Sequence, residues 1–458
     1  MIQTGVERMK RLKTAAWALA LMLSIGSLSM TAMAAEGWSQ SGSQWIYYDS
    51  NGDRVYNTWK KGADNQWRYL DSDGVMATNT WVEDDYYVDA DGVMYTDQWL
   101  KVTDEDGNQE WYYFSSTGKA IKDNWKKIDD KWYHFDSDGR METGWIEDDM
   151  YYCNASGEML TGWQQLYSPD KEDSDSVTPG YDSLGYDGGK NWYYFSATGK
   201  KYLPDEDESG DEYGTRKIEG YYYCLDEDGA MQTGWKEVRS KGGDTILNYM
   251  YFGEDGKGKI GWYSMYPPED LSGYDGDVEW FYFSNSGEPK ASESDRLEED
   301  DIVRINGKKY LFNNLGNPVY GLRKVYISDD DWTAFYFGDK ETSSVQTGKM
   351  TITEDDGTKG DFYFSSSGRG YTGIRDGYLY YAGKKQKALD GVKYACYHVN
   401  GKNYVVNKSG KVMDDDEVKN EDGVKFVTNG SGELISADGE TDISGYVEEP
   451  IEPCWDED

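Results

Sequence analysis

The sequence predicts an all-β protein, an elongated β-solenoid built from tandem β-hairpin repeats of about 20 residues. Three observations predict this fold. Tryptophan recurs at short intervals, an aromatic quartet of the type Trp-Tyr-Tyr-Phe follows each of these tryptophans, and the chain has 53 Gly but only 9 Pro, which is typical of many short turns. A single hairpin of this length buries too little surface to be stable, so we expect successive hairpins to stack on their neighbours.

A leading tryptophan, mostly preceded by Gly, Thr or Asn, opens most of the repeats. In the amino-terminal part the leading tryptophans are 18 to 26 residues apart, at Trp38, Trp59, Trp81, Trp99, Trp125, Trp145 and Trp163. A period near twenty residues indicates a repeat architecture.

The second strand of each repeat carries the aromatic quartet. In the best-kept repeat, a polar turn at Asp129-Asp130 separates the leading Trp125 from the quartet Trp132-Tyr-His-Phe135, which is a hairpin signature. Side chains alternate across a strand, and the fourth quartet residue is nearly always apolar, so we predict that it lies in the packed interior. About sixteen hairpins are expected, with quartets that begin at Trp45, Trp67, Asp85, Trp111, Trp132, Met150, Trp192, Tyr221, Tyr249, Trp280, Lys309, Ala334, Asp361 and Tyr378 and weaker ones near Asn403 and Lys425.

The first 34 residues have the pattern of a secretory signal peptide. A basic stretch at residues 9–13 precedes an apolar stretch at residues 15–28, and Ala32-Met33-Ala34 supplies a small-x-small cleavage site. The apolar stretch is shorter than the ~20 residues that a membrane span requires. We therefore expect a secreted protein that is associated with the cell surface or cell wall and has no transmembrane anchor.

Four segments follow this leader. Residues 35–163 hold regular aromatic hairpin repeats, 164–325 hold repeats with long acidic insertions, 326–435 hold divergent hairpin repeats, and 436–458 form an acidic carboxyl-terminal tail. After residue 300 the leading Trp becomes Leu322 or Ile374, and the quartets open with Lys309, Ala334 or Asp361. We expect that part to keep the fold without an aromatic binding site.

The charge balance excludes one class of partner. The chain has 86 acidic and 47 basic side chains, a net charge of -39 and a sequence pI of about 4.3. Because a phosphate backbone is bound by basic surface, nucleic acid is not an expected partner.

A family resemblance rests on a short phrase that recurs at hairpin spacing. Met141-Glu-Thr-Gly-Trp145, Met159-Leu-Thr-Gly-Trp163 and Met231-Gln-Thr-Gly-Trp235 stand beside the aromatic quartets. This pattern resembles the cell-wall-binding repeats, also called choline-binding repeats, and related aromatic repeats occur in glucan-binding domains. The resemblance implies that ligand sits between consecutive hairpins, in a cage made by two Trp of one hairpin and a Tyr of the next.

Carrying this cage over residue by residue gives four expected sites. They are Trp38 and Trp45 with Tyr69, Trp59 and Trp67 with Tyr87, Trp99 and Trp111 with Tyr133, and Trp125 and Trp132 with Tyr152. Sites at Trp163 and Trp262 are expected to be absent or reshaped, because long insertions separate these residues from Trp192 and Trp280. Packing between hairpins is the alternative role for every one of these tryptophans.

The ring-lined cage suits a quaternary ammonium, which has no N–H to donate and is recognised by several aromatic faces. The sequence therefore favours a secreted, non-catalytic protein that attaches to a choline-substituted cell-wall polymer of the teichoic acid type. Two alternatives stay open, namely recognition of a neutral glycan by the same rings and a surface scaffold or adhesin whose repeats bind no small ligand.

Other chemistry has little support in the sequence. The chain has only two histidines, His134 and His398, so no catalytic residues, metal ligands or cofactor are expected. The recurring Asp-x-Asp-Gly segments lack the other ligands of a calcium loop and are explained by turn chemistry. Of the four cysteines, Cys153 and Cys224 take the apolar fourth quartet position and are expected to be buried thiols.

Overall fold

The computed structural model describes residues 35–103, 107–169, 190–205, 213–239 and 242–455. The predicted signal peptide and the acidic insertion at residues 171–189 lie outside these residues. The described part contains thirty-five strands and three short 3-10 turns, η1 (Ile246–Asn248), η2 (Glu299–Asp301) and η3 (Ser444–Tyr446). Among these residues no helix has both the length and the apolar character needed to cross a membrane.

The strands form consecutive antiparallel hairpins, in two compact units. The first unit holds the described residues up to Ile146 together with Tyr152–Met159. The second unit holds Glu147–Tyr151 and the described residues from Leu160 onward. The hairpins up to the boundary are β1 (Gly37–Ser41) with β2 (Gln44–Tyr48), β3 (Thr58–Lys61) with β4 (Trp67–Leu70), β5 (Thr80–Val82) with β6 (Tyr86–Val88), β7 (Gln98–Thr103) with β8 (Gln109–Phe114), β9 (Asn124–Ile128) with β10 (Lys131–Phe135), and β11 (Gly144–Ile146) with β12 (Tyr151–Cys153).

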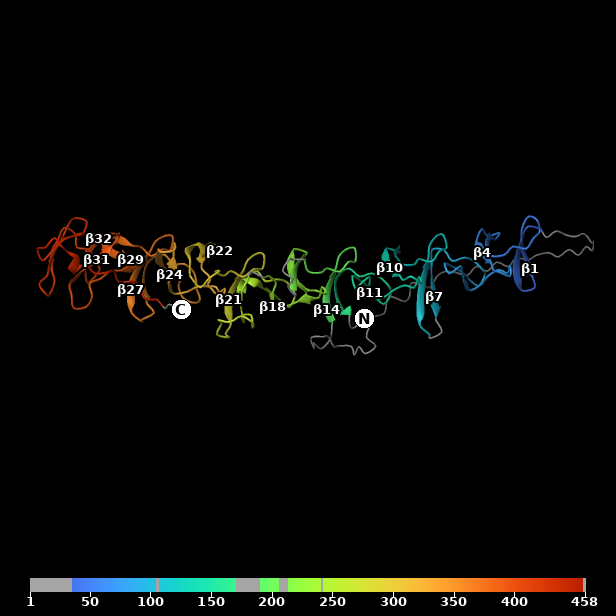
Figure 1. Cartoon of the computed structure of the whole chain (residues 1–458), viewed down its shortest axis with the longest axis horizontal. Coiled ribbons are helices and arrows are strands. Elements are labelled where there is room, and N and C mark those ends of the chain that lie inside the picture. The colour runs from blue at the N-terminus through green and yellow to red at the C-terminus, as the bar shows by residue number, and fades with distance from the viewer. Residues whose placement is uncertain (1–34, 104–106, 170–189, 206–212, 240–241, 456–458) are drawn as a thin grey trace, which may run out of the picture. The chain divides into compact units, whose positions relative to one another are not determined.

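The second unit begins with the same arrangement and then departs from it (Figure 1). Its regular hairpins are β13 (Gly162–Tyr167) with β14 (Lys190–Phe195), β18 (Gly234–Glu237) with β19 (Tyr249–Phe252), β20 (Gly261–Met265) with β21 (Glu279–Phe283), β22 (Val303–Ile305) with β23 (Lys308–Tyr310), β24 (Leu322–Tyr326) with β25 (Trp332–Tyr336), and β31 (Tyr394–Val399) with β32 (Lys402–Asn407). Three sheets are larger. A three-stranded sheet has the order β15 (Tyr213–Ile218), β16 (Tyr221–Asp226), β17 (Met231–Gln232), and another has the order β33 (Glu417–Lys419), β34 (Lys425–Thr428), β35 (Leu434–Ala437). A five-stranded sheet has the order β26 (Gly348–Thr353), β27 (Lys359–Phe364), β30 (Lys384–Lys385), β29 (Tyr378–Tyr381), β28 (Gly373–Arg375). The predicted all-β fold of tandem hairpins that stack as a solenoid is confirmed.

A recurring backbone hydrogen bond joins many of the hairpins to the next, whereas Pro289 and Pro318 take the donor position in two hairpins and have no N–H. The acceptor is the carbonyl of the first quartet residue of one hairpin. The donor is a backbone N–H of the following hairpin, six positions after the fourth residue of its quartet. The Met141 N–H donates to the Trp111 carbonyl at 2.7 Å, and the Met94 N–H donates to the Trp67 carbonyl at 3.0 Å. The same methionines pack against the turn glycine of the hairpin that follows their own. A Cβ on Gly118, which has φ +84°, would lie 2.4 Å from the Met94 sulfur. The methionines therefore serve inter-hairpin packing, and these turns require glycine.

The interior consists of the fourth quartet residues, as the sequence predicts. In the second to the thirteenth of the fourteen full quartets, this residue is at most 2% exposed: Leu70, Val88, Phe114, Phe135, Cys153, Phe195, Leu225, Phe252, Phe283, Phe312, Phe337 and Phe364. The predicted position of the quartet at Tyr221 is wrong by one residue. Leu225 pairs with Met231, and the carbonyl of Tyr222 accepts the inter-hairpin bond from Gly258, so this quartet runs from Tyr222 to Leu225 and not from Tyr221 to Cys224.

The residues after β35 pack back onto the divergent hairpins. Trp455 lies 5.3 Å from Trp332, ring centroid to ring centroid, and the Lys324 ammonium lies 4.7 Å from the Trp332 centroid. The buried carboxylate of Glu354 accepts from the Lys384 ammonium at 2.9 Å and from the backbone N–H of Cys454. The last described residues of the chain, predicted as an acidic tail, thus complete the packing of this part of the second unit.

Three of the four cysteines are buried thiols, and this gives a first testable prediction. Burial raises the pKa of Cys153, Cys224 and Cys396 to about 12. Because the thiolate is the reactive form, these residues should resist iodoacetamide at pH 8, while the partly exposed Cys454 is alkylated first. Peptide mass spectrometry measures the four rates, and the unfolded chain in urea, where all four should react, is the control. Equal labelling of Cys153 and Cys454 in the folded protein would contradict the prediction.

Candidate ligand-binding site

Six tryptophans that open a quartet lie on the surface of the hairpins. Their exposed fractions are 37 to 47%, and they are Trp45, Trp67, Trp111, Trp132, Trp192 and Trp280. The fourth residues of the same quartets are buried or half-buried. Large rings held in solvent at a repeated position mark a binding surface more often than isolated exposed apolar residues do. We refer to these six residues as the exposed tryptophans.

The leading tryptophans, in contrast, pack between hairpins. Trp99 lies 5.2 Å from Tyr113, the third quartet residue of its own hairpin, and 5.0 Å from Tyr133, the second quartet residue of the next hairpin. The same two contacts recur for Trp59, Trp81, Trp163, Trp235 and Trp262. The leading tryptophan thus has the structural role that the sequence left open, and the second quartet residue is the ring that reaches back to it.

Both units bring an exposed tryptophan, a leading tryptophan and the tyrosine of the next hairpin together. In the first unit, Trp111 lies 6.2 Å from Trp99 at an interplanar angle of 86°, and Tyr133 completes the group. In the second unit, Trp280 lies 6.4 Å from Trp262 at 75°, and Tyr310 lies 5.1 Å from Trp262. Within these groups Trp111 is 37% exposed and Trp280 is 47% exposed. We call these the Trp99 group and the Trp262 group.

The other predicted tyrosines contact the leading tryptophan of their own hairpin. Tyr69 contacts Trp59 of its own hairpin at 5.2 Å, Tyr87 contacts Trp81 at 5.7 Å, and Tyr152 contacts Trp145 at 5.2 Å. Each is a third quartet residue, which pairs across the hairpin with its own leading tryptophan, as Trp59 does with Tyr69. The ring that approaches Trp59 from the next hairpin is Tyr86, at 5.2 Å.

The remaining predicted residues have individual surroundings. The Trp38 indole N–H donates to the Lys61 carbonyl at 3.0 Å, and its ring lies 5.5 Å from Tyr47. Trp125 lies 4.8 Å from His134, and Trp45 and Trp132 are exposed tryptophans.

The Trp262 group was expected to be absent or reshaped, yet it has the same three-ring arrangement as the Trp99 group. The residues inserted between Trp262 and Trp280 extend the hairpin beyond the strands, and the register Trp262–Tyr282 matches Trp99–Tyr113. Trp163 pairs with Tyr194 in the same way. The signal that could have identified the group is the tyrosine at the second quartet position of the next hairpin, Tyr310.

The exposed tryptophans carry cationic neighbours at some hairpins and neutral neighbours at others. Lys61 and Lys101 pair across the hairpin with Trp67 and Trp111, and their ammonium groups lie 5.0 and 5.2 Å from the ring centroids. Trp280 pairs with Ser264 instead. Rings of this surface therefore already hold ammonium groups of the chain itself, which is the chemistry of a cation–π site.

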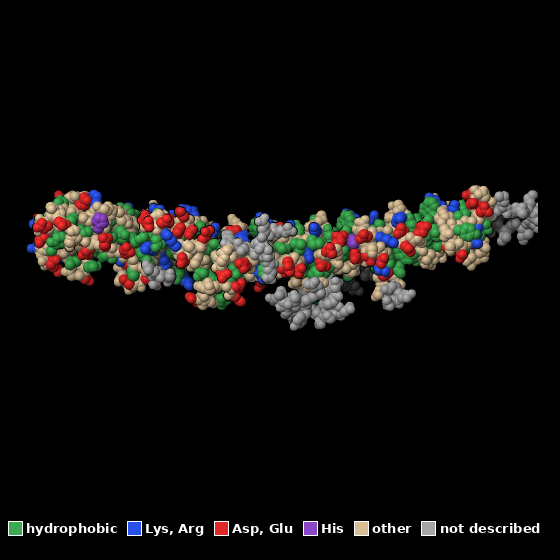
Figure 2. Space-filling view, viewed as in Figure 1, with side chains coloured by type: hydrophobic (Ala, Val, Ile, Leu, Met, Phe, Trp, Pro, Cys, Tyr) green, Lys and Arg blue, Asp and Glu red, His purple; other side chains and the backbone are tan. Residues whose placement is uncertain are grey.

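Tyr133 stays a neutral phenol in the Trp99 group, because burial raises its pKa. Carboxylates are spread over the face seen in Figure 2 and not gathered at one place. Within the described ranges no group of three or more His, Cys, Asp or Glu is arranged to hold a metal ion. The chemistry that the groups offer is therefore that of aromatic faces.

The chain matches known repeat families in its amino-terminal part. Residues 61–94 and 123–163 match choline-binding repeats, and residues 98–120 match a cell wall binding repeat. The chain therefore carries repeats of the choline-binding, cell-wall-binding class. Trp99, Trp111 and Tyr133 lie inside the matched residues, whereas the Trp262 group lies outside them. No curated protein matches the chain.

Several of the solved structures that are similar to the chain come from Streptococcus pneumoniae. They include the modular autolysin LytC (21% identity, 64% of this chain and 55% of that chain, TM-score 0.37), the choline-binding domain of CbpL (24%, 49% and 98%, 0.33) and choline-binding protein F (22%, 74% and 99%, 0.32). The chain thus spans about half the length of the autolysin.

Proposed function

We propose that this protein is a secreted, non-catalytic component of the cell surface that binds choline groups of a cell-wall polymer. The observation that carries the proposal is the Trp99 group, in which an exposed tryptophan stands against a leading tryptophan and the tyrosine of the next hairpin, inside residues that match choline-binding repeats. The leader pattern of residues 1–34 supports secretion. Hairpins throughout the described residues, with only two histidines in the chain, support a non-catalytic role.

The energetics fit a polymeric ligand. One aromatic face contributes roughly 0.5–2 kcal/mol to binding a cation, so three faces give about 2–5 kcal/mol, a range that brackets a site of millimolar affinity. Several such sites on one chain that engage one polymer raise the apparent affinity by roughly 10²–10⁴. The repeated exposed tryptophans supply this multivalency.

A neutral glycan is the second candidate, because the open ring faces of the exposed tryptophans would also stack on the apolar face of a sugar. A sugar has no charge to compete with the ammonium groups of Lys61 and Lys101. Binding of a glycan should therefore be insensitive to free choline.

Retention on a choline-substituted resin separates the two candidates. We expect the protein to be retained at 0.15 M salt, to be released by millimolar free choline, and to pass through a dextran resin. A concomitant change in tryptophan fluorescence is expected on titration with choline. Absence of retention at low salt would contradict choline binding, and retention on dextran that choline does not reverse would establish the glycan alternative.

A further inference from the structure

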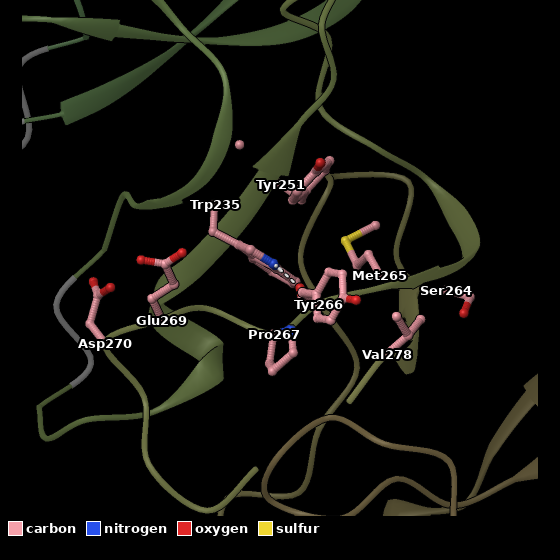
Figure 3. A pocket seen from close by; sticks show the side chains of 10 residues that line it. Trp235, Tyr251, Ser264, Met265, Tyr266, Pro267, Glu269, Asp270 and Val278 are labelled. Carbon is pink, nitrogen blue, oxygen red and sulfur yellow. Dashed lines mark hydrogen bonds between the residues drawn. The ribbon is translucent and has the colours of Figure 1, made fainter. Parts of the chain in front are cut away.

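A walled pocket takes the place of an open aromatic surface at the hairpin β18–β19. Its volume is about 590 Å³, and it is lined by Gly234, Trp235, Tyr251, Ser264, Met265, Tyr266, Pro267, Glu269, Asp270 and Val278. In the view of Figure 3 the Trp235 ring lies between the carboxylates of Glu269 and Asp270 and the ring of Tyr266. All lining residues belong to the second unit.

The wall is built by the connection between β20 and β21, which replaces a short turn. The Trp235 indole N–H donates to the Tyr266 carbonyl at 2.8 Å, and the Tyr249 hydroxyl donates to Asp270 at 3.3 Å. Further along, the half-buried Tyr274 donates from its hydroxyl to the Leu315 carbonyl at 2.6 Å. The first two hydrogen bonds hold the connection against the hairpin β18–β19, and the third holds it against the residues that follow β23.

The connection also changes the character of the first quartet position. Tyr249 opens this quartet and is only 5% exposed, whereas Trp280 in the next hairpin is 47% exposed. Burial raises the pKa of Tyr249 to about 12, so it remains a hydrogen-bond donor to Asp270 at neutral pH. The open ring of the hairpins that carry an exposed tryptophan is thus exchanged for a pocket lined by rings and two carboxylates.

The pocket lining combines three aromatic rings with two carboxylates. The rings belong to Trp235, Tyr251 and Tyr266, and the lining has no Lys, Arg or His. Aromatic faces attract any organic cation, but a carboxylate distinguishes between cations. A primary ammonium has three N–H donors, and a hydrogen bond between two charged groups is about twice as strong as one between neutral groups. A trimethylammonium group has no N–H and gains nothing from this.

We infer that this pocket binds a primary ammonium group carried on a short carbon chain, in preference to a quaternary ammonium. The rings hold the carbon atoms next to the charge, and Glu269 and Asp270 accept its N–H bonds. The volume leaves room for the molecule to which the chain is attached. The inference goes beyond choline recognition, because none of the three rings of the Trp99 group or of the Trp262 group lines this pocket.

Ethanolamine and choline form the matched pair of probes, since they differ only in the methyl groups on nitrogen. Calorimetric titration of the full chain should show ethanolamine binding that the double variant E269Q/D270N weakens at least tenfold. Tyr266→Ala should weaken it several-fold, because it removes an exposed ring but keeps the carbonyl that Trp235 uses. Choline binding should be the same in all three proteins.

D275N/D277N is the matched control, because it removes the same two charges from exposed residues of the same connection that do not line the pocket. This variant should bind ethanolamine like the wild type. Nα-acetyl-lysine methylamide is the second probe, and whichever of the two amines binds more tightly shows whether the ammonium belongs to an aminoethyl group or to a lysine side chain. Equal ethanolamine affinity in E269Q/D270N and the wild type would overturn the inference, as would equal losses in E269Q/D270N and the control.

Discussion

Replacing all six exposed tryptophans by alanine should lower the apparent affinity for a choline-bearing surface by roughly 10²–10⁴, with little change in the stability of the fold. The residues are Trp45, Trp67, Trp111, Trp132, Trp192 and Trp280. Each supplies an open ring face to its site, and the affinity of the whole chain depends on several sites that act together. A single replacement should therefore weaken retention modestly, and the six together should abolish it.

The small effect on stability follows from where these side chains lie. They are 37 to 47% exposed, and the interior below them is filled by the fourth quartet residues. Surface substitutions away from buried groups usually change stability by no more than about 0.5 kcal/mol. The melting temperature and the far-UV circular dichroism spectrum check this directly.

A control variant replaces four other exposed apolar residues, Tyr56, Ile260, Leu389 and Ile435, by alanine. It removes apolar surface of comparable exposure at positions that do not open a quartet, and it should keep full retention on the choline resin. Equal loss in both variants would mean that retention depends on general hydrophobicity. Full retention of the six-fold variant would exclude the exposed tryptophans as the choline sites.

The fold was predictable because the sequence repeats the same hairpin pattern many times. The leading Trp, the polar turn and the aromatic quartet recur often enough that a weak hairpin signal in any one copy is reinforced by the others. The burial of the fourth quartet residue followed from the alternation of side chains along a strand, and Phe114 and Phe364 are both fully buried.

The partners of the leading tryptophans were less predictable, because they depend on strand register and stacking. The choice between Tyr86 and Tyr87 beside Trp59 requires knowing that Tyr87 pairs across its own hairpin with Trp81. The quartet at Tyr222 was misplaced because five aromatic or apolar residues stand in a row, and only the pairing of Leu225 with Met231 resolves the register.

The contacts of Trp455 and the pocket beside Trp235 lie outside any periodic pattern. Trp455 meets Trp332 from a part of the chain more than 100 residues away, and the pocket depends on the residues inserted between β20 and β21. The signal for such features is their departure from the repeat. At these places the sequence alone shows that the chain departs from the repeat, but it does not show the structure that results.

Phe135→Ala should destabilise the first unit by about 3–5 kcal/mol, the usual cost of removing a buried phenylalanine ring. Phe135 is fully buried with Tyr113 and Ile128, and its ring lies 5.7 Å from that of Trp99. Its loss removes the support on which the Trp99 group rests, so binding should fall through loss of structure. Phe135→Leu, which keeps most of the volume, should cost less than about 1.5 kcal/mol. Urea unfolding followed by intrinsic fluorescence measures both.

The place where this loss appears tests the solenoid itself. In a stack where each repeat contacts only its neighbours, stability is a sum of local terms, so Phe135→Ala should raise hydrogen exchange in the strands of residues 98–135 and leave the cluster around Tyr397 and Val406 unchanged. Trp111→Ala in the same group should do the reverse, with weaker binding and unchanged exchange. A uniform rise in exchange across the chain after Phe135→Ala would show that the hairpins unfold as one cooperative body and that the leading tryptophans transmit stability far beyond their neighbours.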